Sequence, residues 1–94
     1  MERIKISVII PVYNVAPYIT DCLHSVMRQS YQGSIECLII DDCGTDNSME
    51  VVNSVLNDYN GKIDFKVLHH ECNRGLSAAR NTGVACATGD YLYF

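Results

Sequence analysis

The chain has 94 residues, of which 48% are apolar, and it carries a formal net charge of −4 at pH 7. This length fits one small domain, residues 1–94, and the apolar content argues against a disordered chain. The seven Lys and Arg residues are scattered rather than clustered, so the sequence offers no basic surface and we expect no nucleic acid as a partner.

The cysteines are odd in number, and no two of them have the CxxC spacing: Cys22, Cys37, Cys43, Cys72 and Cys86. This pattern indicates neither a disulfide framework nor a zinc site, so we expect free thiols and a cytoplasmic setting. The start of the chain lacks a signal-peptide pattern, and the longest apolar run, residues 8–12, is too short to span a bilayer. Peripheral association with the inner face of a membrane stays open.

The first predicted strand covers residues 5–10, which are β-branched and almost continuously apolar, as is typical of a strand covered on both faces. We expect Pro11 to end this strand because proline donates no hydrogen bond to a ladder. A helix is predicted over residues 18–29, with Pro17 suited to its first turn. Residues 36–40 then predict a second buried strand.

A polar loop follows the second strand, with Asp46 and Ser48 as candidate N-caps of a helix over residues 49–59. We expect Asn60-Gly61 to close this helix in a left-handed C-cap. Residues 64–69 predict a third strand, residues 75–87 a helix with Ala and Gly on its packing side, and residues 89–94 a fourth strand. The order βαβαβαβ predicts an α/β fold: a three-layer, Rossmann-like open sheet of mainly parallel strands.

Asp41 and Asp42 form the first candidate constellation, at the carboxyl end of the second strand. Adjacent carboxylates repel one another and resist burial, so another group must offset their charge. Because side chains alternate along a strand, the two point to opposite sides and have different roles. One of them is placed to accept a hydrogen bond from a ring N–H or a ribose hydroxyl. The alternative, which the sequence supports equally, is that one Asp caps the following helix and the other is solvated.

The residues that follow the first strand form the second constellation, Pro11 to Asn14. They lie on the ligand side of the sheet, next to the Asp pair if the two strands are neighbours. Tyr13 offers a ring on which a flat base can stack. The alternative is a turn tyrosine that packs on the first helix.

The third constellation is the segment of residues 73–83, which opens the third helix. Free backbone N–H groups at a helix start bind anions, and Arg74 or Arg80 would strengthen such a site. The alternative is that the two arginines are only charged surface residues of a helix that packs on the sheet. The segment carries neither GxGxxG nor a P-loop motif. His69 and His70 are adjacent at a strand end, hence on opposite faces, and no third ligand accompanies them, so we expect no metal there.

Together these segments resemble family 2 glycosyltransferases, specifically the amino-terminal, nucleotide-binding half. The resemblance rests on four motifs in order: residues 7–14 (SVIIPVYN), 41–46 (DDCGTD), 73–83 (NRGLSAARNTG) and 88–94 (TGDYLYF). It covers essentially the whole chain. It implies a GT-A fold and an enzyme that transfers a sugar, with inversion, from a nucleotide diphosphate-sugar donor, a UDP-sugar, to a glycan or lipid-linked acceptor in polysaccharide biosynthesis.

Residue by residue, Pro11, Tyr13 and Asn14 resemble the loop beside the base. Asp42 resembles the carboxylate that meets the uracil ring, Asp41 lies beside it, and Arg80 resembles the wall of the donor pocket. Cys43-Gly44 departs from the small pair, commonly Gly-Ser, that the family has there.

The resemblance also implies a divalent metal, Mn²⁺ or Mg²⁺, for the full enzyme. Its Asp-x-Asp ligands follow the last strand of this half in the family, and the catalytic base lies further on. Neither is in this sequence, so we expect no catalytic residue here and no sugar transfer by this stretch alone.

Two alternatives remain open at this stage. One is a non-catalytic α/β binding module that presents its acidic loop to a partner. The other is an inactive fragment whose last strand, an unpaired edge, pairs with a second copy to form a homodimer.

Overall fold

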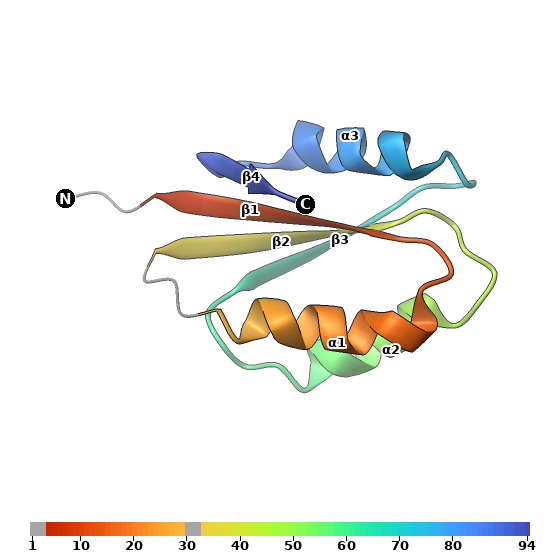
Figure 1. The fold of residues 1–94 in the computed structure, drawn as a ribbon, viewed down its shortest axis with the longest axis horizontal. Coiled ribbons are helices and arrows are strands. Elements are labelled where there is room, and N and C mark those ends of the chain that lie inside the picture. The colour runs from red at the N-terminus through yellow and green to blue at the C-terminus, as the bar shows by residue number, and fades with distance from the viewer. Residues whose placement is uncertain (1–3, 30–32) are drawn as a thin grey trace.

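The computed structural model describes residues 4–29 and 33–94. Strands and helices alternate as the sequence predicts: β1 (Lys5–Val12), α1 (Ala16–Met27), β2 (Ser34–Asp41), α2 (Ser48–Asn57), β3 (Asp64–His69), α3 (Leu76–Cys86) and β4 (Tyr91–Tyr93). The described strands form one parallel sheet of order β3-β2-β1-β4 (Figure 1). The predicted α/β fold with parallel strands is confirmed.

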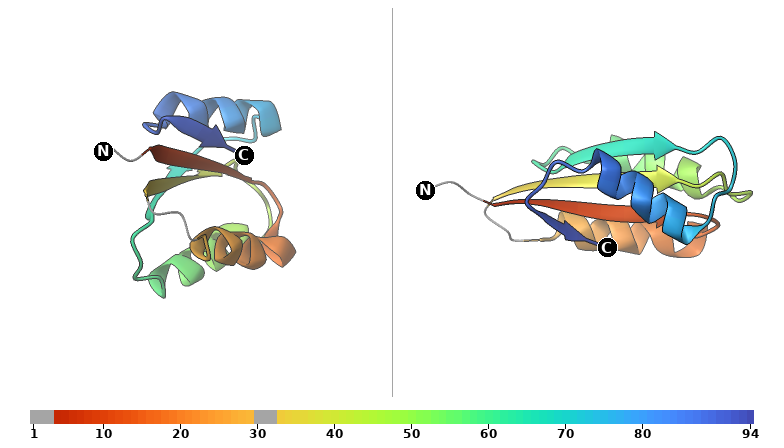
Figure 2. Two further views of the ribbon diagram at one scale, coloured as in Figure 1. Left: turned by 60° about the vertical axis from the view of Figure 1, so that its left-hand side comes forward. Right: turned by 90° about the horizontal axis from the view of Figure 1, so that it is seen from above.

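The sheet lies between two layers of helices. Helices α1 and α2 cover one face and α3 covers the other (Figures 1 and 2). Three layers follow from strands that are apolar on both sides, because each face needs its own cover. None of the helices within residues 4–29 and 33–94 has the length and apolar character needed to cross a bilayer.

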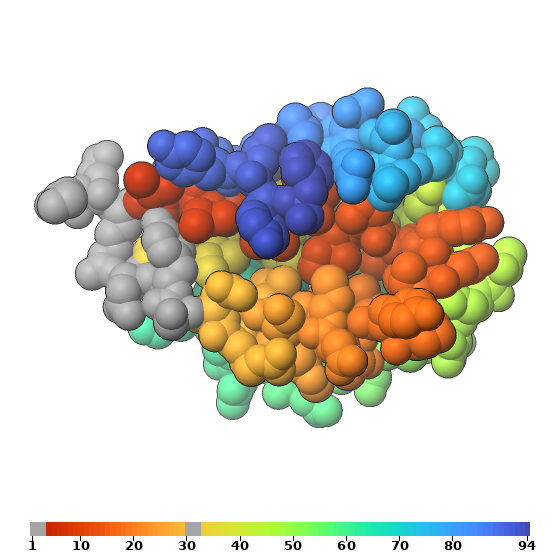
Figure 3. Space-filling model, viewed as in Figure 1, coloured from red at the N-terminus to blue at the C-terminus, as the bar shows by residue number. Residues whose placement is uncertain are grey.

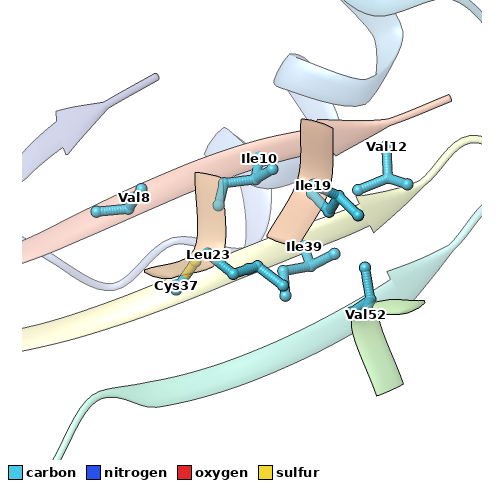
Figure 4. Packing of buried hydrophobic residues seen from close by; sticks show 8 residues of the cluster. All are labelled: Val8, Ile10, Val12, Ile19, Leu23, Cys37, Ile39 and Val52. Carbon is cyan, nitrogen blue, oxygen red and sulfur yellow. The ribbon is translucent and has the colours of Figure 1, made fainter. Parts of the chain in front are cut away.

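The larger core fills the space between the sheet and the α1–α2 layer. Alternate residues of β1 and β2 point into it and meet apolar side chains of both helices: Val8, Ile10, Val12, Cys37, Ile39, Ile19, Leu23 and Val52 (Figure 4). The intervening residues Ile9, Leu38 and Ile40 pack with Ala79 on the α3 side. The continuous apolar runs are thus buried on both faces, as the sequence predicts.

Gly83 lets α3 approach the sheet closely. A Cβ atom built at this position would lie 2.5 Å from Cγ2 of Ile9, which is fully buried. The small residues on the packing side of this helix therefore have the role that their pattern predicts.

The α3 side also holds a fully buried carboxylate, Glu36 of β2, which the sequence pattern did not predict. Its oxygens accept hydrogen bonds from Ser7 Oγ at 2.5 Å, the Thr88 N–H at 2.6 Å and Lys66 Nζ at 3.1 Å. Burial alone would raise the pKa of Glu36, but these donors outweigh it and lower the pKa to about 2. Glu36 thereby ties the segment before β4 to the first two strands.

Two local predictions are wrong. Pro11 does not end β1, which continues to Val12. The Val12 carbonyl accepts from the Asp42 N–H, so the backbone polar groups of Val12 point toward β2. Those of Pro11, one residue earlier, therefore point toward the β4 side. The pairing with β4 ends at Val8–Tyr93, so a proline at position 11 breaks no ladder bond there.

The second concerns the end of α2, which stops at Asn57 with Asp58 as its C-cap. Positive φ angles in the described residues occur at Asn14, Cys43 and Gly75, so Asn60-Gly61 is not a left-handed cap. Glycine is needed at position 61 for another reason: a Cβ atom there would meet the ring of Tyr59. That ring lies edge-on to Phe65, and its hydroxyl accepts from the Ile63 N–H.

Candidate functional site

The candidate site lies at the carboxyl-terminal edge of the sheet. Strands β2 and β3 lie on one side of β1 and β4 lies on the other, so the strand order reverses at β1. Ligands of open α/β sheets bind beyond the carboxyl ends of the strands at such a reversal. The loops after β1, β2 and β3 reach this edge together, on the right of Figure 1.

Asn14 joins the first two of these loops. Its side-chain oxygen accepts from the backbone N–H groups of Thr45 at 2.8 Å and Asp46 at 3.2 Å. Asn14 has φ of +52°, a conformation that Asn tolerates better than most residues. A Cβ atom at Gly44 would lie 2.7 Å from the same oxygen, so only glycine fits against it. Asn14 therefore positions the loops.

The β2–α2 loop is also joined to the start of α1. Asp46 accepts from the Ser48 N–H at 2.9 Å and from the Ala16 N–H at 3.1 Å, while Ser48 Oγ accepts from the Val15 N–H at 2.9 Å. The Ser48 hydroxyl donates to Asp46 as well, and this bond, followed by the backbone N–H bonds, lowers the pKa of the Asp46 carboxyl. Neither candidate is the N-cap of α2, which is Asn47 with no side-chain capping bond; Asp46 instead accepts from the first N–H of the helix, that of Ser48.

Half-buried Asp41 and exposed His69 form a pair on the α1–α2 side. His69 Nδ1 lies 2.9 Å from Asp41 Oδ2, and the Cys43 N–H donates to Oδ1 at 3.1 Å. Asp41 also lines a cavity of about 180 Å³ with Val12, Asn14, Cys43, Gly44, Asp46, Ser48 and Met49. Because ligand sites usually enclose about 300 Å³ or more, the described residues form at most part of one here.

Asp42 points to the α3 side and is only 2% exposed. One carboxylate oxygen, Oδ1, lies 2.7 Å from His70 Nδ1 and accepts from the Arg74 N–H at 2.9 Å. The other, Oδ2, accepts from the Gly75 N–H and from Asn73 Nδ2, each at 2.9 Å. The two aspartates thus point to opposite sides, as predicted, but Asp42 is neither solvated nor the N-cap of α2.

The Asp42 site determines how the chain enters α3. Burial alone would raise the pKa of Asp42, but the His70 bond and the two backbone N–H bonds outweigh it and lower the pKa. Gly75 has φ of +93°, which favours glycine at this N-cap position. All four of its hydrogen bonds are made within the protein, and only the donor from Asn73 comes from an exposed side chain.

His70 and Thr82 are functional candidates that the sequence analysis missed. His70 Nε2 lies 2.7 Å from Thr82 Oγ1, so the buried ring joins Asp42 to α3. A sequence signal did exist: His70 follows β3 as Asp42 follows β2, and residues at matching positions of paired strands share a face.

Tyr13, Pro11 and Arg80 complete the predicted set. Tyr13 directly follows β1 and is 44% exposed, while Pro11 is half-buried within the strand. The guanidinium of Arg80, an exposed residue of α3, lies 5.6 Å from the centre of the Phe94 ring, a cation–π distance. This contact lies where β4 ends, next to β1, and Figure 3 shows that end of the chain at the surface between α3 and α1.

A larger cavity, of about 680 Å³, opens at the other edge of the sheet, where β1, β2 and β3 begin. It lies away from Asp41, Asp42 and His70. We place the site at the carboxyl-terminal edge because the polar side chains converge there and because the strand order reverses there.

The described residues do not form a metal site. They contain no group of three or more His, Cys, Asp and Glu side chains that could hold a metal ion. His69 and His70 each face their own aspartate, on opposite sides of the sheet, as their spacing predicts.

In a comparison with protein families, residues 7–94 match the model described as Glycosyl transferase family 2. Among curated proteins, an uncharacterized glycosyltransferase of Haemophilus influenzae is 42% identical over 94 residues, which are the whole of this chain and 36% of that protein.

Two solved structures have the same fold. A mannosyltransferase from Pyrobaculum calidifontis, in complex with GDP-Man and Mn²⁺, has a TM-score of 0.88 at 26% identity, over 98% of this chain and 27% of that one. TarS of Staphylococcus aureus, in complex with UDP-GlcNAc, has a TM-score of 0.81 at 35% identity, over 95% of this chain and 25% of that one. This chain therefore spans about a quarter to a third of these three proteins.

Proposed function

Since the chain belongs to glycosyl transferase family 2, we propose that it forms the donor-nucleotide site of an enzyme that transfers a sugar from a UDP-sugar to an acceptor. The observation that carries the proposal is the hydrogen-bonded Asp42 carboxylate, with one displaceable donor, at the edge where the strand order reverses. The nucleotide-sugars bound to the TarS and mannosyltransferase structures support the class of donor.

Asp42 recognises the base in this proposal. Three of its four donors are fixed by the fold: the buried His70 ring and two backbone N–H groups. The fourth is the amide of Asn73, an exposed residue. A ring N–H of uracil can replace that amide on Oδ2 while the other three bonds stay in place. Guanine also presents a ring N–H, so Asp42 alone does not select between UDP and GDP.

The other predicted residues surround this contact. The backbone bond from Asp42 to Val12 brings Tyr13 alongside Asp42, and the exposed Tyr13 ring is the surface on which the base stacks. Asp41 supports the ribose, Pro11 and Asn14 hold the loop in place, and Arg80 lines the pocket near the end of β4.

Sugar transfer in this proposal is a single in-line displacement at the anomeric carbon, with inversion. The acceptor, a glycan or a lipid-linked glycan, supplies the attacking hydroxyl, and a base outside this chain takes its proton. A divalent metal would neutralise the diphosphate leaving group, but the residues described here do not fit one, so we place its ligands outside residues 4–29 and 33–94. Cytoplasmic location, peripheral membrane association and a homodimer through the β4 edge belong to the same proposal.

Titration calorimetry with UDP on the full-length protein, with Mn²⁺ present, tests the donor site. Asp42→Asn removes the charge and should weaken binding about tenfold or more, because hydrogen bonds to charged groups contribute about 1.5–3 kcal/mol. Asn73→Ala removes only the displaceable donor and should bind UDP at least as tightly as the natural protein. Asp58→Asn, an exposed change at the end of α2, is the matched control. Unchanged UDP affinity in Asp42→Asn would contradict the role of Asp42 in base recognition. Binding of GDP but not UDP would contradict uracil as the base.

A further inference from the structure

We propose that His70 is a positioning residue of the donor site: its imidazole orients the Asp42 carboxylate so that Oδ2 is the oxygen that meets the base. This inference rests on the donor site proposed above. It adds a residue to which neither the sequence motifs nor the comparisons assign a role.

Burial and geometry exclude a direct role for His70. Its side chain is 5% exposed, and both ring nitrogens have partners: Asp42 Oδ1 at 2.7 Å and Thr82 Oγ1 at 2.7 Å. No ring nitrogen is left for a metal, a substrate or a proton transfer with solvent. The ring therefore acts through the groups that it holds.

The carboxylate has a defined inner and outer oxygen. Oδ1 is bound by the buried His70 ring and the Arg74 N–H, whereas Oδ2 is bound by the Gly75 N–H and the amide of the exposed Asn73. Rotation of the carboxylate would break the His70 bond. His70 thus determines that Oδ2, and not Oδ1, stays next to the one donor that a ligand can displace.

Thr82 sets the orientation of the ring. The ionised Asp42 can only accept, so His70 Nδ1 donates to it. Nε2 lies 2.7 Å from the Thr82 hydroxyl, which can accept from it or donate to it, and this bond fixes the ring plane, as an outer partner does for many functional histidines. The three side chains form a line from β2 through the residue after β3 to α3.

Two conservative variants separate positioning from a purely structural role. The amide nitrogen of Asn superimposes on Nδ1 of histidine, so His70→Asn keeps the donor to Asp42 and loses the Thr82 bond. The amide of Gln reaches the place of Nε2, so His70→Gln keeps the Thr82 bond and loses the donor to Asp42. Each variant keeps one bond. A purely structural role would make the loss of UDP affinity follow the loss of stability in each variant, whereas positioning lowers the affinity of His70→Gln beyond its loss of stability.

The test is UDP affinity by calorimetry on the full-length protein, with urea unfolding of each variant alongside. We expect His70→Gln to bind UDP about tenfold more weakly or worse, and His70→Asn to stay within about threefold of the natural protein. His24→Gln, the same change at an exposed position of α1, is the control and should bind as the natural protein does. Equal affinities for His70→Asn and His70→Gln overturn the proposal.

A spectroscopic measurement covers the case in which a variant does not fold. In the unmodified protein the ring ¹⁵N and Nδ1–H resonances of His70 should shift when UDP is added, because the base changes the charge distribution on Asp42. Unchanged resonances in a protein that binds UDP overturn the positioning role alone. Failure of the unmodified protein to bind UDP or GDP overturns the donor site itself.

Discussion

Two histidine–aspartate pairs lie side by side at the same edge of the sheet, yet they differ in almost every physical respect. His69 and Asp41 are 64% and 19% exposed, with 2.9 Å between Nδ1 and Oδ2. The side chains of His70 and Asp42 are 5% and 3% exposed, with 2.7 Å between Nδ1 and Oδ1. The pairs are neighbours in sequence on both strands, so the alternation of a strand alone sends one to the solvent and the other beneath α3.

This difference shows that the residue types of a His–Asp pair do not determine what the pair contributes to stability and to the geometry around it. Exposed ion pairs contribute little because water and salt screen them. A buried carboxylate must be fully hydrogen-bonded, and the resulting network orients the groups around it. The same two residue types therefore give a surface contact on one face of the sheet and a built acceptor site on the other.

The largest expected effect is the loss of the buried carboxylate. Asp42→Ala leaves His70 and the N–H groups of Arg74 and Gly75 without their acceptor and should lower the free energy of unfolding by about 4 kcal/mol. Asp41→Ala should lower it by less than about 1 kcal/mol. Urea unfolding followed by circular dichroism measures both, and similar losses for the two variants would end the distinction between the pairs.

Low pH should destabilise the protein through the two buried carboxylates on the α3 side of the sheet. Asp42 and Glu36 both have folded-state pKa values below their ordinary ones, that of Glu36 at about 2 instead of 4.5. Their contributions are complete above about pH 4.5 and are lost as the pH falls toward 2, with roughly 3 kcal/mol lost for Glu36. Urea unfolding from pH 6 to pH 2 measures the loss. Glu36→Gln should flatten the curve, and a natural protein equally stable at both ends would contradict the pKa shifts.

Closer contact of α3 with the sheet should be unfavourable. Gly83→Ala brings a methyl group against the buried Ile9 side chain, and overpacking of about 2 kcal/mol outweighs a helix-propensity gain of about 1 kcal/mol. We expect a net loss of about 1 kcal/mol in urea unfolding. Ser77→Ala, on the exposed side of the same helix, is the control and should be neutral or slightly stabilising. A Gly83→Ala protein as stable as this control would show that α3 packs more loosely than described.

The smallest effect is expected at the exposed pair. His69→Gln removes a surface contact to Asp41 and should change the free energy of unfolding by about 0.5 kcal/mol or less. Because the pair is exposed, raising the ionic strength should reduce even this difference. A loss as large as that of the Asp42 variant would mean that exposure does not separate the two pairs.

The fold was predictable because its signals are local and repeated. Apolar runs such as Val8–Val12 specify strands buried on both faces, and Pro17 and Gly83 mark a helix start and a close packing surface. The two errors, at Pro11 and at Asn60-Gly61, arose where a local rule depends on the neighbour: the side to which a nitrogen faces, or the ring that folds over a glycine.

The candidate site was predictable only in part. The alternation rule correctly placed Asp41 and Asp42 on opposite sides of the sheet. It could not show that His70 and two backbone N–H groups, about thirty residues further along the chain, complete the Asp42 site. Such partners become visible only through the register of β2 with β3, which adjacent residue types do not specify.

The most direct test of the account is a structure of the protein with UDP bound. We predict the N3–H of the uracil within hydrogen-bond distance of Asp42 Oδ2, the Asn73 amide displaced, and the bonds from His70, Arg74 and Gly75 retained. A base bound elsewhere, with the Asn73 amide still on Asp42, would contradict it.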